Sequence, residues 1–369
     1  GSMAFEALVA EEWIISDSLW RSTRGEAWSP VPVPGDVAAL PLESFDARCH
    51  PNGWEEPGFD DSGWGRATEI AAMHTGGNAD PHPPSVPFGI ISPPVRGAFP
   101  DGATHRAERT SLRWVTGGEA SGDPVVQVSR DASSDAAPAR LPEGSHEVRQ
   151  PSPVGSEGFV DPTVELHSFD LGRVAAGTLE LHVEGAVAGT TLDVAAGEHV
   201  GADGQLVLLG QHCGVRYVCS GARAERFESF DPVGARYLHV SVRGQLADIE
   251  VSLHDRHRPR PPGASFACSD PVLEEVHATG LRTVDLCAPD AYIDCPTREQ
   301  RAWTGDSVVH QMVDLVANPD WSMARWHPQL AASPRPDGML PMAAASDFAL
   351  DDRTYVPDWS LHWVHSVHN

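Results

Sequence analysis

The residues with the clearest capacity for chemistry lie together at positions 294–306, where the sequence reads DCPTREQRAWTGD. Three carboxylates, two guanidinium groups and one indole fall within these thirteen residues. A protonated carboxylic acid can donate a proton to the departing oxygen of a glycosidic bond, and ionised carboxylates and arginines can hold ring hydroxyls by charge-assisted hydrogen bonds. An aromatic face packs against the apolar side of a sugar ring. This mixture of side chains favours a carbohydrate-cleaving site.

A purely structural loop is the alternative interpretation of the same segment. It lies between two predicted helices, so its carboxylates and arginines could cap helix ends and pair with each other. Composition alone leaves both interpretations open.

Helices are predicted on both sides of the segment, after a stiff linker at 256–262 (RHRPRPP). The first should begin at Pro271 with Asp270 as N-cap, the second near Asp306 and the fourth near Asp358, while the third carries Trp326 and Leu330. The second helix should bury an apolar stripe made of Val308, Val309, Met312, Val313 and Val316. The fourth presents Trp359, Trp363, Val364 and Val367 and is still helical in character at Asn369. Four helices with such stripes do not close a core, so we expect partner helices outside this chain.

Before the linker, the sequence favours strands and loops. LELHV at 179–183 and YLHVSV at 237–242 alternate apolar and polar residues, as half-buried strands do. Two β-sandwich units are predicted: a jelly-roll-like unit at 1–100, and a second unit at 101–262 with a long loop or insertion at 117–158.

The thirteen-residue segment resembles the active-site signature of the α-L-rhamnosidases of glycoside hydrolase family 78. Further matches to this family are SFACSDP at 265–271, FDDSGW at 59–64 with Trp54, FDAR at 45–48, GARY at 234–237, PDG at 336–338 and PDW at 357–359. The resemblance implies a multidomain β + α protein, in which N-terminal β-sandwich domains precede the first helices of an (α/α)6 barrel. Residues 263–369 would be the incomplete start of that catalytic domain. Trp54 and Trp64 are expected in the sandwich core, with a carbohydrate-facing surface as the alternative.

The resemblance also implies a role for each matching residue in the cleavage of terminal α-L-rhamnose with inversion of configuration. Glu299 would be the general acid. Asp294, Arg298 and Asp306 would bind rhamnose hydroxyls, Trp303 would wall the pocket, and Trp359 would be a second aromatic wall.

Inversion requires a second carboxylate roughly 6.5–9.5 Å from the acid, which activates water on the opposite face of the ring. In the family this base is a Glu late in the barrel, but no Glu follows Glu299 in this chain. We therefore expect the general base to lie outside the chain, with Asp347, Asp351 or Asp352 as the candidates within it. Those three aspartates lack the glycine-containing loop of a calcium site.

Charge and composition exclude several function classes. The formal net charge of −26 opposes a nucleic-acid partner, and no apolar run is long enough to span a membrane. Gly1–Met3 looks like the remnant of a cleaved tag, and no secretion segment follows it. The six cysteines lack metal-binding spacing and are expected to be free thiols in a cytoplasmic protein.

No cofactor or metal is expected. His362, His365 and His368 recur every three residues and drift around a helix, so packed or solvated side chains are favoured over ligands. The expected partners are a rhamnosylated small molecule or oligosaccharide, and the missing C-terminal barrel portion or a second chain that supplies it. Two other functions stay open: an inactive carbohydrate-binding fragment, or the same fold acting on another deoxy sugar or a pentose.

Overall fold

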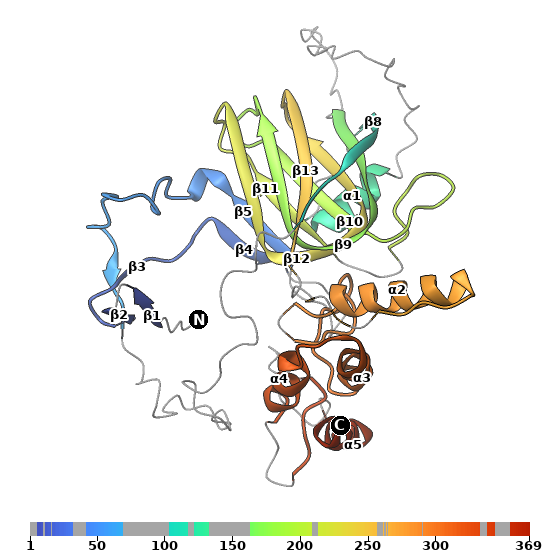
Figure 1. Ribbon diagram of the computed structural model, residues 1–369. Coiled ribbons are helices and arrows are strands. Elements are labelled where there is room, and N and C mark those ends of the chain that lie inside the picture. The colour runs from blue at the N-terminus through green and yellow to red at the C-terminus, as the bar shows by residue number, and fades with distance from the viewer. Residues whose placement is uncertain are drawn as a thin grey trace, which may run out of the picture.

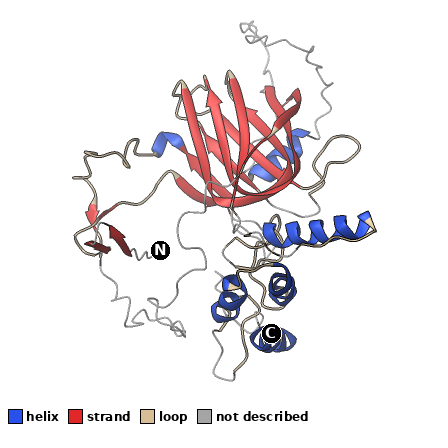
Figure 2. Cartoon of the chain, in the orientation of Figure 1, coloured by secondary structure: helices blue, strands red, loops and turns tan. Residues whose placement is uncertain are grey.

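The computed structural model describes residues 6–9, 12–15, 17–31, 42–68, 103–116, 122–132, 163–208, 213–256, 261, 263, 265–289, 291–332, 338–343 and 355–369. In the described part of the chain up to Asp255, the regular elements are strands, one short helix and one 3₁₀ turn, and helices follow after it (Figure 1, Figure 2). Asp347, Asp351 and Asp352 lie outside the described residues, as do 257–260 of the linker and most of 117–158.

The strands form one large sheet and two small pairs. They are β1 Glu6–Val9, β2 Glu12–Ile15, β3 Arg21–Ser22, β4 Trp28–Val31, β5 Leu42–Asp46, β6 Gly65–Arg66, β7 Thr104–Arg106, β8 Glu108–Thr116, β9 Thr163–Glu184, β10 Thr191–Gly197, β11 Gly214–Val218, β12 Ala224–Arg243 and β13 Asp248–Asp255. The nine-stranded sheet has the order β4-β5-β11-β10-β12-β9-β13-β7, with β8 paired to β9. The small pairs are β1–β2 and β3–β6.

The two longest strands, β9 and β12, give this sheet two layers. The first half of β9 pairs with β8, whereas its second half pairs with β13. Along β12, the register with β9 shifts between Glu228 and Pro232 and again between Ala235 and Tyr237, and only the part after the second shift pairs with β10. Strands that bend at bulges can pass from one layer to the next. A β-sandwich results, as the sequence predicts.

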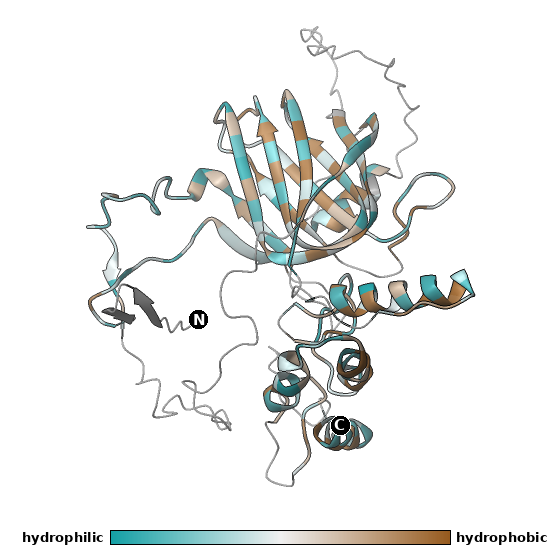
Figure 3. Ribbon diagram, in the orientation of Figure 1, coloured by the Kyte–Doolittle hydropathy of each residue, from teal (hydrophilic) through white to brown (hydrophobic). Residues whose placement is uncertain are grey.

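The core lies between the two layers. Its buried residues include Leu181 of β9, Val194 of β10, Leu238 of β12 and Val251 of β13. Apolar and polar residues alternate along these strands, as the bands of Figure 3 show. The strands predicted at 179–183 and 237–242 are present, and every core-facing residue in both runs is at most 1% exposed. The prediction that they are half-buried is wrong for 237–242, because the polar His239 and Ser241 are buried as well.

A short helix, α1 (Pro124–Ala132), covers the outer face of one layer. Val125 and Val128 pack there against Leu166 and Ala195 of the sheet. Asp123 starts the helix, because its Oδ1 accepts hydrogen bonds from the N–H groups of Val125 (2.8 Å) and residue 126 (3.1 Å). The sequence predicted only a long loop or insertion at 117–158, so this helix is an addition to that prediction.

Strands β4 and β5 belong to the large sheet, although they come from the unit predicted at 1–100. β5 runs parallel to β11, with Phe45 opposite Tyr217. The boundary between the two predicted units stays a prediction. The expectation that Trp54 is a core residue is wrong, because its side chain is 49% exposed on a turn segment after β5.

Four helices follow the sandwich: α2 Pro271–Leu286, α3 Ser307–Ala317, α4 Ser322–Leu330 and α5 Pro357–His368. All four lie where the sequence predicts helices. Asp270 caps α2 by accepting a hydrogen bond from the Val272 N–H at 2.9 Å. Among the described residues, no helix has the length and apolar character needed to cross a membrane.

The predicted burial of the apolar stripe of α3 is wrong. Val308 is buried, but Val309, Met312 and Val316 are 62%, 50% and 81% exposed. The side of α3 that faces α4 and α5 is polar instead: the buried Gln311 Nε2 donates to the carbonyl oxygens of Ala324 and Ser366, both at 2.9 Å. Exposed apolar residues on the other helices are Val272, Leu273 and Val276 of α2 and Leu361, Val364 and Val367 of α5.

Candidate active site

The segment 294–306 forms a closed loop between α2 and α3. The Asp294 N–H donates to the Arg301 carbonyl at 3.0 Å, and the Arg301 N–H donates back to Asp294 Oδ1 at 2.9 Å. Inside the loop, the Glu299 N–H points at Cys295 Sγ, 3.4 Å away. Burial and a hydrogen bond with Asp294 raise the pKa of the Cys295 thiol, so the sulfur stays neutral and serves as a packing and hydrogen-bonding group.

Glu299 is held at both carboxylate oxygens. Its Oε2 accepts a hydrogen bond from Trp303 Nε1 at 2.6 Å, and its Oε1 pairs with the Arg298 guanidinium. The Glu299 side chain is only 12% exposed, whereas that of Arg298 is 42% exposed. Glu299 is therefore a mostly buried carboxyl group with both oxygens held, beside a more exposed cation.

Two tryptophans meet beside this carboxyl group. Trp303 and Trp359, which comes from α5, have ring centroids 5.4 Å apart and planes at 69°. Gly305 allows this approach, because a Cβ at that position would lie 2.8 Å from the indole of Trp359. The glycine of the sequence signature therefore brings α5 against the loop.

Asp306 lies next to Asp294. Partial burial, followed by repulsion from Asp294, raises the pKa of Asp306, and nearby His362 partly offsets this. Although Asp306 precedes α3, its side chain makes no capping hydrogen bond. The helix-capping interpretation therefore does not account for this carboxylate, which remains available to a hydroxyl group.

The structure thus brings all six predicted site residues into one cluster, five from the loop and Trp359 from α5. Three further residues of this region had no role in the predicted site. They are the buried Arg301, Gln300, and Glu198 from the turn after β10. Glu198 accepts a hydrogen bond from Thr297. No local signal could have identified Glu198, because it lies 99 residues before its partner. Among the described residues, no group of three His, Cys, Asp or Glu side chains has the geometry to hold a metal ion.

Known protein families match both regions of this chain. The family model of the bacterial alpha-L-rhamnosidase concanavalin-like domain matches residues 163–256, and that of the bacterial alpha-L-rhamnosidase 6 hairpin glycosidase domain matches residues 261–369. These ranges cover the β9–β13 part of the sandwich and all four later helices with the candidate site. An alpha-L-rhamnosidase of Streptomyces avermitilis is 26% identical over 304 residues, which is 80% of this chain and 22% of the relative.

Solved structures share the fold. The alpha-L-rhamnosidase of Dictyoglumus thermophilum aligns with a TM-score of 0.58 at 18% identity, over 96% of this chain and 32% of its own. The Streptomyces avermitilis alpha-L-rhamnosidase in complex with L-rhamnose aligns with a TM-score of 0.53 at 20% identity, over 99% of this chain and 31% of its own.

The two matched models define the class: a concanavalin-like domain followed by a glycosidase domain. With both of its domain models matched in order, the chain belongs to the bacterial α-L-rhamnosidase family. It spans between about a fifth and a third of the length of these relatives.

Proposed function

We propose that this chain is part of a glycoside hydrolase that removes terminal α-L-rhamnose from a small molecule or an oligosaccharide, with Glu299 as the general acid. The observation that carries the proposal is the position of Glu299 between Arg298 and Trp303, inside a loop where two further carboxylates gather. The names of the relatives support the same sugar, and one of them was solved with L-rhamnose.

In this proposal the reaction proceeds with inversion. Protonated Glu299 donates its proton to the glycosidic oxygen as the bond to the sugar breaks. In the same step, a second carboxylate takes a proton from the water that attacks the opposite face of the ring. The exposed apolar residues of α2, α3 and α5 support a missing C-terminal barrel portion, or a second chain, as the source of that base.

The neighbours of Glu299 would bind and orient the sugar. An arginine favours the ionised form of a carboxyl group at its side. Arg298 therefore has to exchange Glu299 for a sugar hydroxyl before the acid can hold its proton. Asp294 and Asp306 would accept hydrogen bonds from other hydroxyls, while Trp303 and Trp359 form the wall beside them.

The proposal is tested with Glu299→Gln, assayed on an aryl α-L-rhamnoside with this chain and with any longer product of its gene. The amide cannot donate the leaving-group proton, so turnover should fall by about 10²–10⁴-fold. Rhamnose binding, measured by calorimetry, should persist in this variant but weaken in Asp294→Ala and Asp306→Ala, which remove charged acceptors.

Glu275→Gln is the matched control, because it makes the same change on the exposed surface of α2. Near-wild-type turnover of Glu299→Gln would refute the acid assignment. If every form binds rhamnose without cleaving it, the inactive carbohydrate-binding fragment becomes the better description. Faster cleavage of another deoxy sugar or of a pentoside would change the substrate and leave the reaction class intact.

A further inference from the structure

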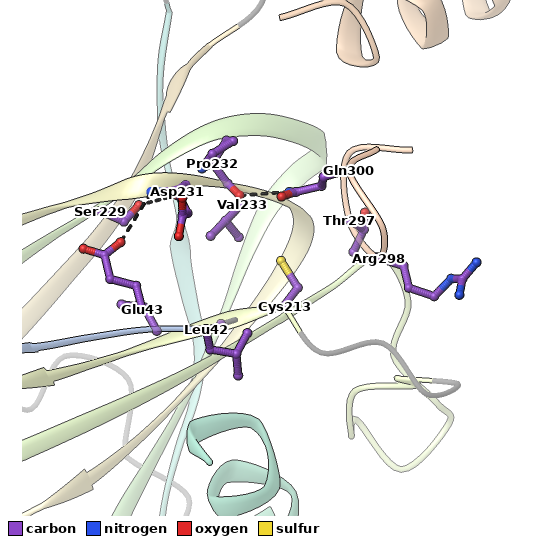
Figure 4. A pocket seen from close by; sticks show the side chains of 12 residues that line it. Leu42, Glu43, Cys213, Ser229, Asp231, Pro232, Val233, Thr297, Arg298 and Gln300 are labelled. Carbon is purple, nitrogen blue, oxygen red and sulfur yellow. Dashed lines mark hydrogen bonds between the residues drawn. The ribbon is translucent and has the colours of Figure 1, made fainter. Parts of the chain in front are cut away.

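The candidate acid lies on a loop whose other side is attached to the β-sandwich. Gln300, the residue after Glu299, donates from its Nε2 to the carbonyl oxygens of Pro232 (2.9 Å) and Pro296 (2.7 Å). Pro232 belongs to β12, whereas Pro296 belongs to the loop. One amide group therefore joins the loop to the sandwich, and Figure 4 shows the Gln300 side chain reaching Pro232.

The backbone at Gln300 is held in an unfavourable conformation. Its φ of 53° is the only positive value of a non-glycine residue in the described part of the chain. The left-handed region costs a residue with a Cβ about 1–2 kcal/mol, and such a conformation persists only where the surroundings fix it. The two hydrogen bonds of its own side chain contribute to that constraint, together with the hydrogen bond from the Glu299 N–H to Cys295 Sγ in the same turn.

Gly234 of β12 allows the loop to come this close. A Cβ at this position would lie 2.1 Å from the carbonyl oxygen of Pro296 and 2.5 Å from its carbonyl carbon. The backbone of the strand and the backbone of the loop are therefore in direct contact. The register of β12 also shifts just before Pro232, and such irregularities bend a strand locally.

Hydrogen bonds, rather than close packing alone, fix this contact. A cavity of about 30 Å³ remains between loop and sandwich, bordered by Cys213, Val233 and Thr297 (Figure 4). That volume has room for about two water molecules. Beside it, the 3% exposed Thr297 donates its hydroxyl hydrogen to Glu198, so a second hydrogen bond crosses from the loop to the sandwich.

We infer that the β-sandwich positions the catalytic acid, with Gln300 as a positioning residue that ties the Glu299 loop to β12. The effect of this contact on catalysis rests on the function proposed above. The attachment of the loop to β12 does not depend on that function.

The chain contains a matched control for Gln300. Gln311 is buried, whereas Gln300 is half-buried, and it too donates from Nε2 to two backbone carbonyls. Its described hydrogen bonds join α3 to α4 and α5, and none of them reaches the loop. Gln300→Asn and Gln311→Asn each shorten one such amide by one methylene group. Asparagine tolerates a positive φ better than most residues, so Gln300→Asn removes the two hydrogen bonds without adding backbone strain.

The first measurement is hydrogen–deuterium exchange on the 369-residue chain. Deuterium uptake in peptides that cover residues 294–303 should rise in Gln300→Asn and stay at the wild-type level in Gln311→Asn. Equal uptake of these peptides in Gln300→Asn and in the wild type would overturn the inference, whatever the chain catalyses.

The second measurement is turnover of an aryl α-L-rhamnoside by the form of the protein that cleaves it. A displacement of the acid by about an ångström lowers kcat by up to about 100-fold, so Gln300→Asn should lose about 10- to 100-fold in kcat with little change in KM. Gln311→Asn should keep its kcat. Raised exchange with unchanged kcat in Gln300→Asn contradicts the positioning role.

A third variant gives a readout that general destabilisation does not produce. In Gln300→Glu an ionised carboxylate would face two carbonyl oxygens, whereas the protonated form can still donate one hydrogen bond. The ratio of variant to wild-type kcat should therefore rise as the pH falls from 8 to 5, and a constant ratio counts against the inference. If the wild type cleaves no rhamnoside, the proposed function fails, and the exchange experiment alone decides on the contact.

Discussion

The β-sandwich and the helices that follow it bury their apolar residues to different extents. In the sandwich, core residues of β9, β10, β12 and β13 such as Leu181, Val194 and Leu253 have no exposed surface. The largest described cluster between the helices contains only Ala288, Tyr292 and Met323, with Trp326 at its edge. At the same time α2, α3 and α5 expose apolar side chains. The sandwich encloses a core by itself, and the described helices do not.

This difference explains how the candidate site is built. A loop that carries a proton donor has to keep its geometry while substrate enters and leaves. Gln300 and Thr297 attach the loop at 294–306 to the β-sandwich. On the side of the helices, Trp303 of the loop packs against Trp359 of α5. In the proposed function, the sandwich gives this loop a fixed reference, and a substrate would approach from the side of the helices.

The largest expected effect comes from truncating one leucine in each region. Leu181→Ala should lower the free energy of unfolding of the sandwich by about 2–5 kcal/mol, because it leaves a cavity in a closed core. Leu361→Ala in α5, where the side chain is 69% exposed, should change stability by less than about 0.5 kcal/mol. Urea unfolding, followed by circular dichroism at strand and helix wavelengths, measures both. Equal losses in the two variants would show that α5 is covered in solution.

A smaller effect is expected from acid, and it should affect the sandwich. Burial alone would raise the pKa of Glu180 on β9, but hydrogen bonds from Arg226, His254 and His182 outweigh it and lower the pKa from 4.5 to about 2. A carboxyl group whose pKa is lower in the folded state stabilises the fold above its unfolded pKa, and this contribution disappears as the pH falls. Stability of about 2–3 kcal/mol should therefore be lost between about pH 4.5 and about pH 2.

Glu180→Gln removes the titrating group and is the direct test of this pH dependence. The variant should unfold more easily than the wild type at pH 7, and the difference should shrink toward pH 2. Thermal melting over this pH range follows it, with Glu250→Gln on the exposed face of the same sheet as the control. A difference that does not depend on pH would assign Glu180 a packing role only.

Local signals in the sequence predicted much of this architecture. Asp270 before Pro271 marked the start of α2, and alternation at 179–183 marked a core strand, because capping and side-chain periodicity depend on neighbouring residues. Periodicity also located the apolar stripe of α3. It could not show that the stripe faces outward, because burial depends on which elements cover a helix.

For the candidate site, too, the sequence predicted the features that depend on neighbouring residues and not those that depend on distant ones. The types of side chain in 294–306 pointed to its three carboxylates and Trp303, which are close in sequence, whereas Trp359 came from the family resemblance of 357–359. The positive φ of Gln300 carries no sequence signal, because glutamine rarely adopts it. The contacts with Glu198 and Gly234 depend on chain segments that meet only after the sandwich has folded.

The smallest effect on stability is expected on the outer face of α3, and it tests whether that face is covered. Val309, Met312 and Val316 lie three and four residues apart and form one exposed stripe. Val316→Glu should change the stability of the isolated chain by less than about 0.5 kcal/mol, because this side chain is 81% exposed. It should, however, reduce self-association, which light scattering and gel filtration detect, since a charge then interrupts an apolar surface that soluble monomers rarely show.

Gln329→Glu on α4 adds the same charge at an exposed position away from the stripe and should leave self-association unchanged. In any longer form of the protein, added helices could pack on α3. Val316→Glu would then bury an unpaired charge and lower the free energy of unfolding by about 3–5 kcal/mol. The same substitution is then nearly neutral in one form and severe in the other. If it is neutral in both, the apolar face of α3 is open to solvent, and the general base has to come from a different surface.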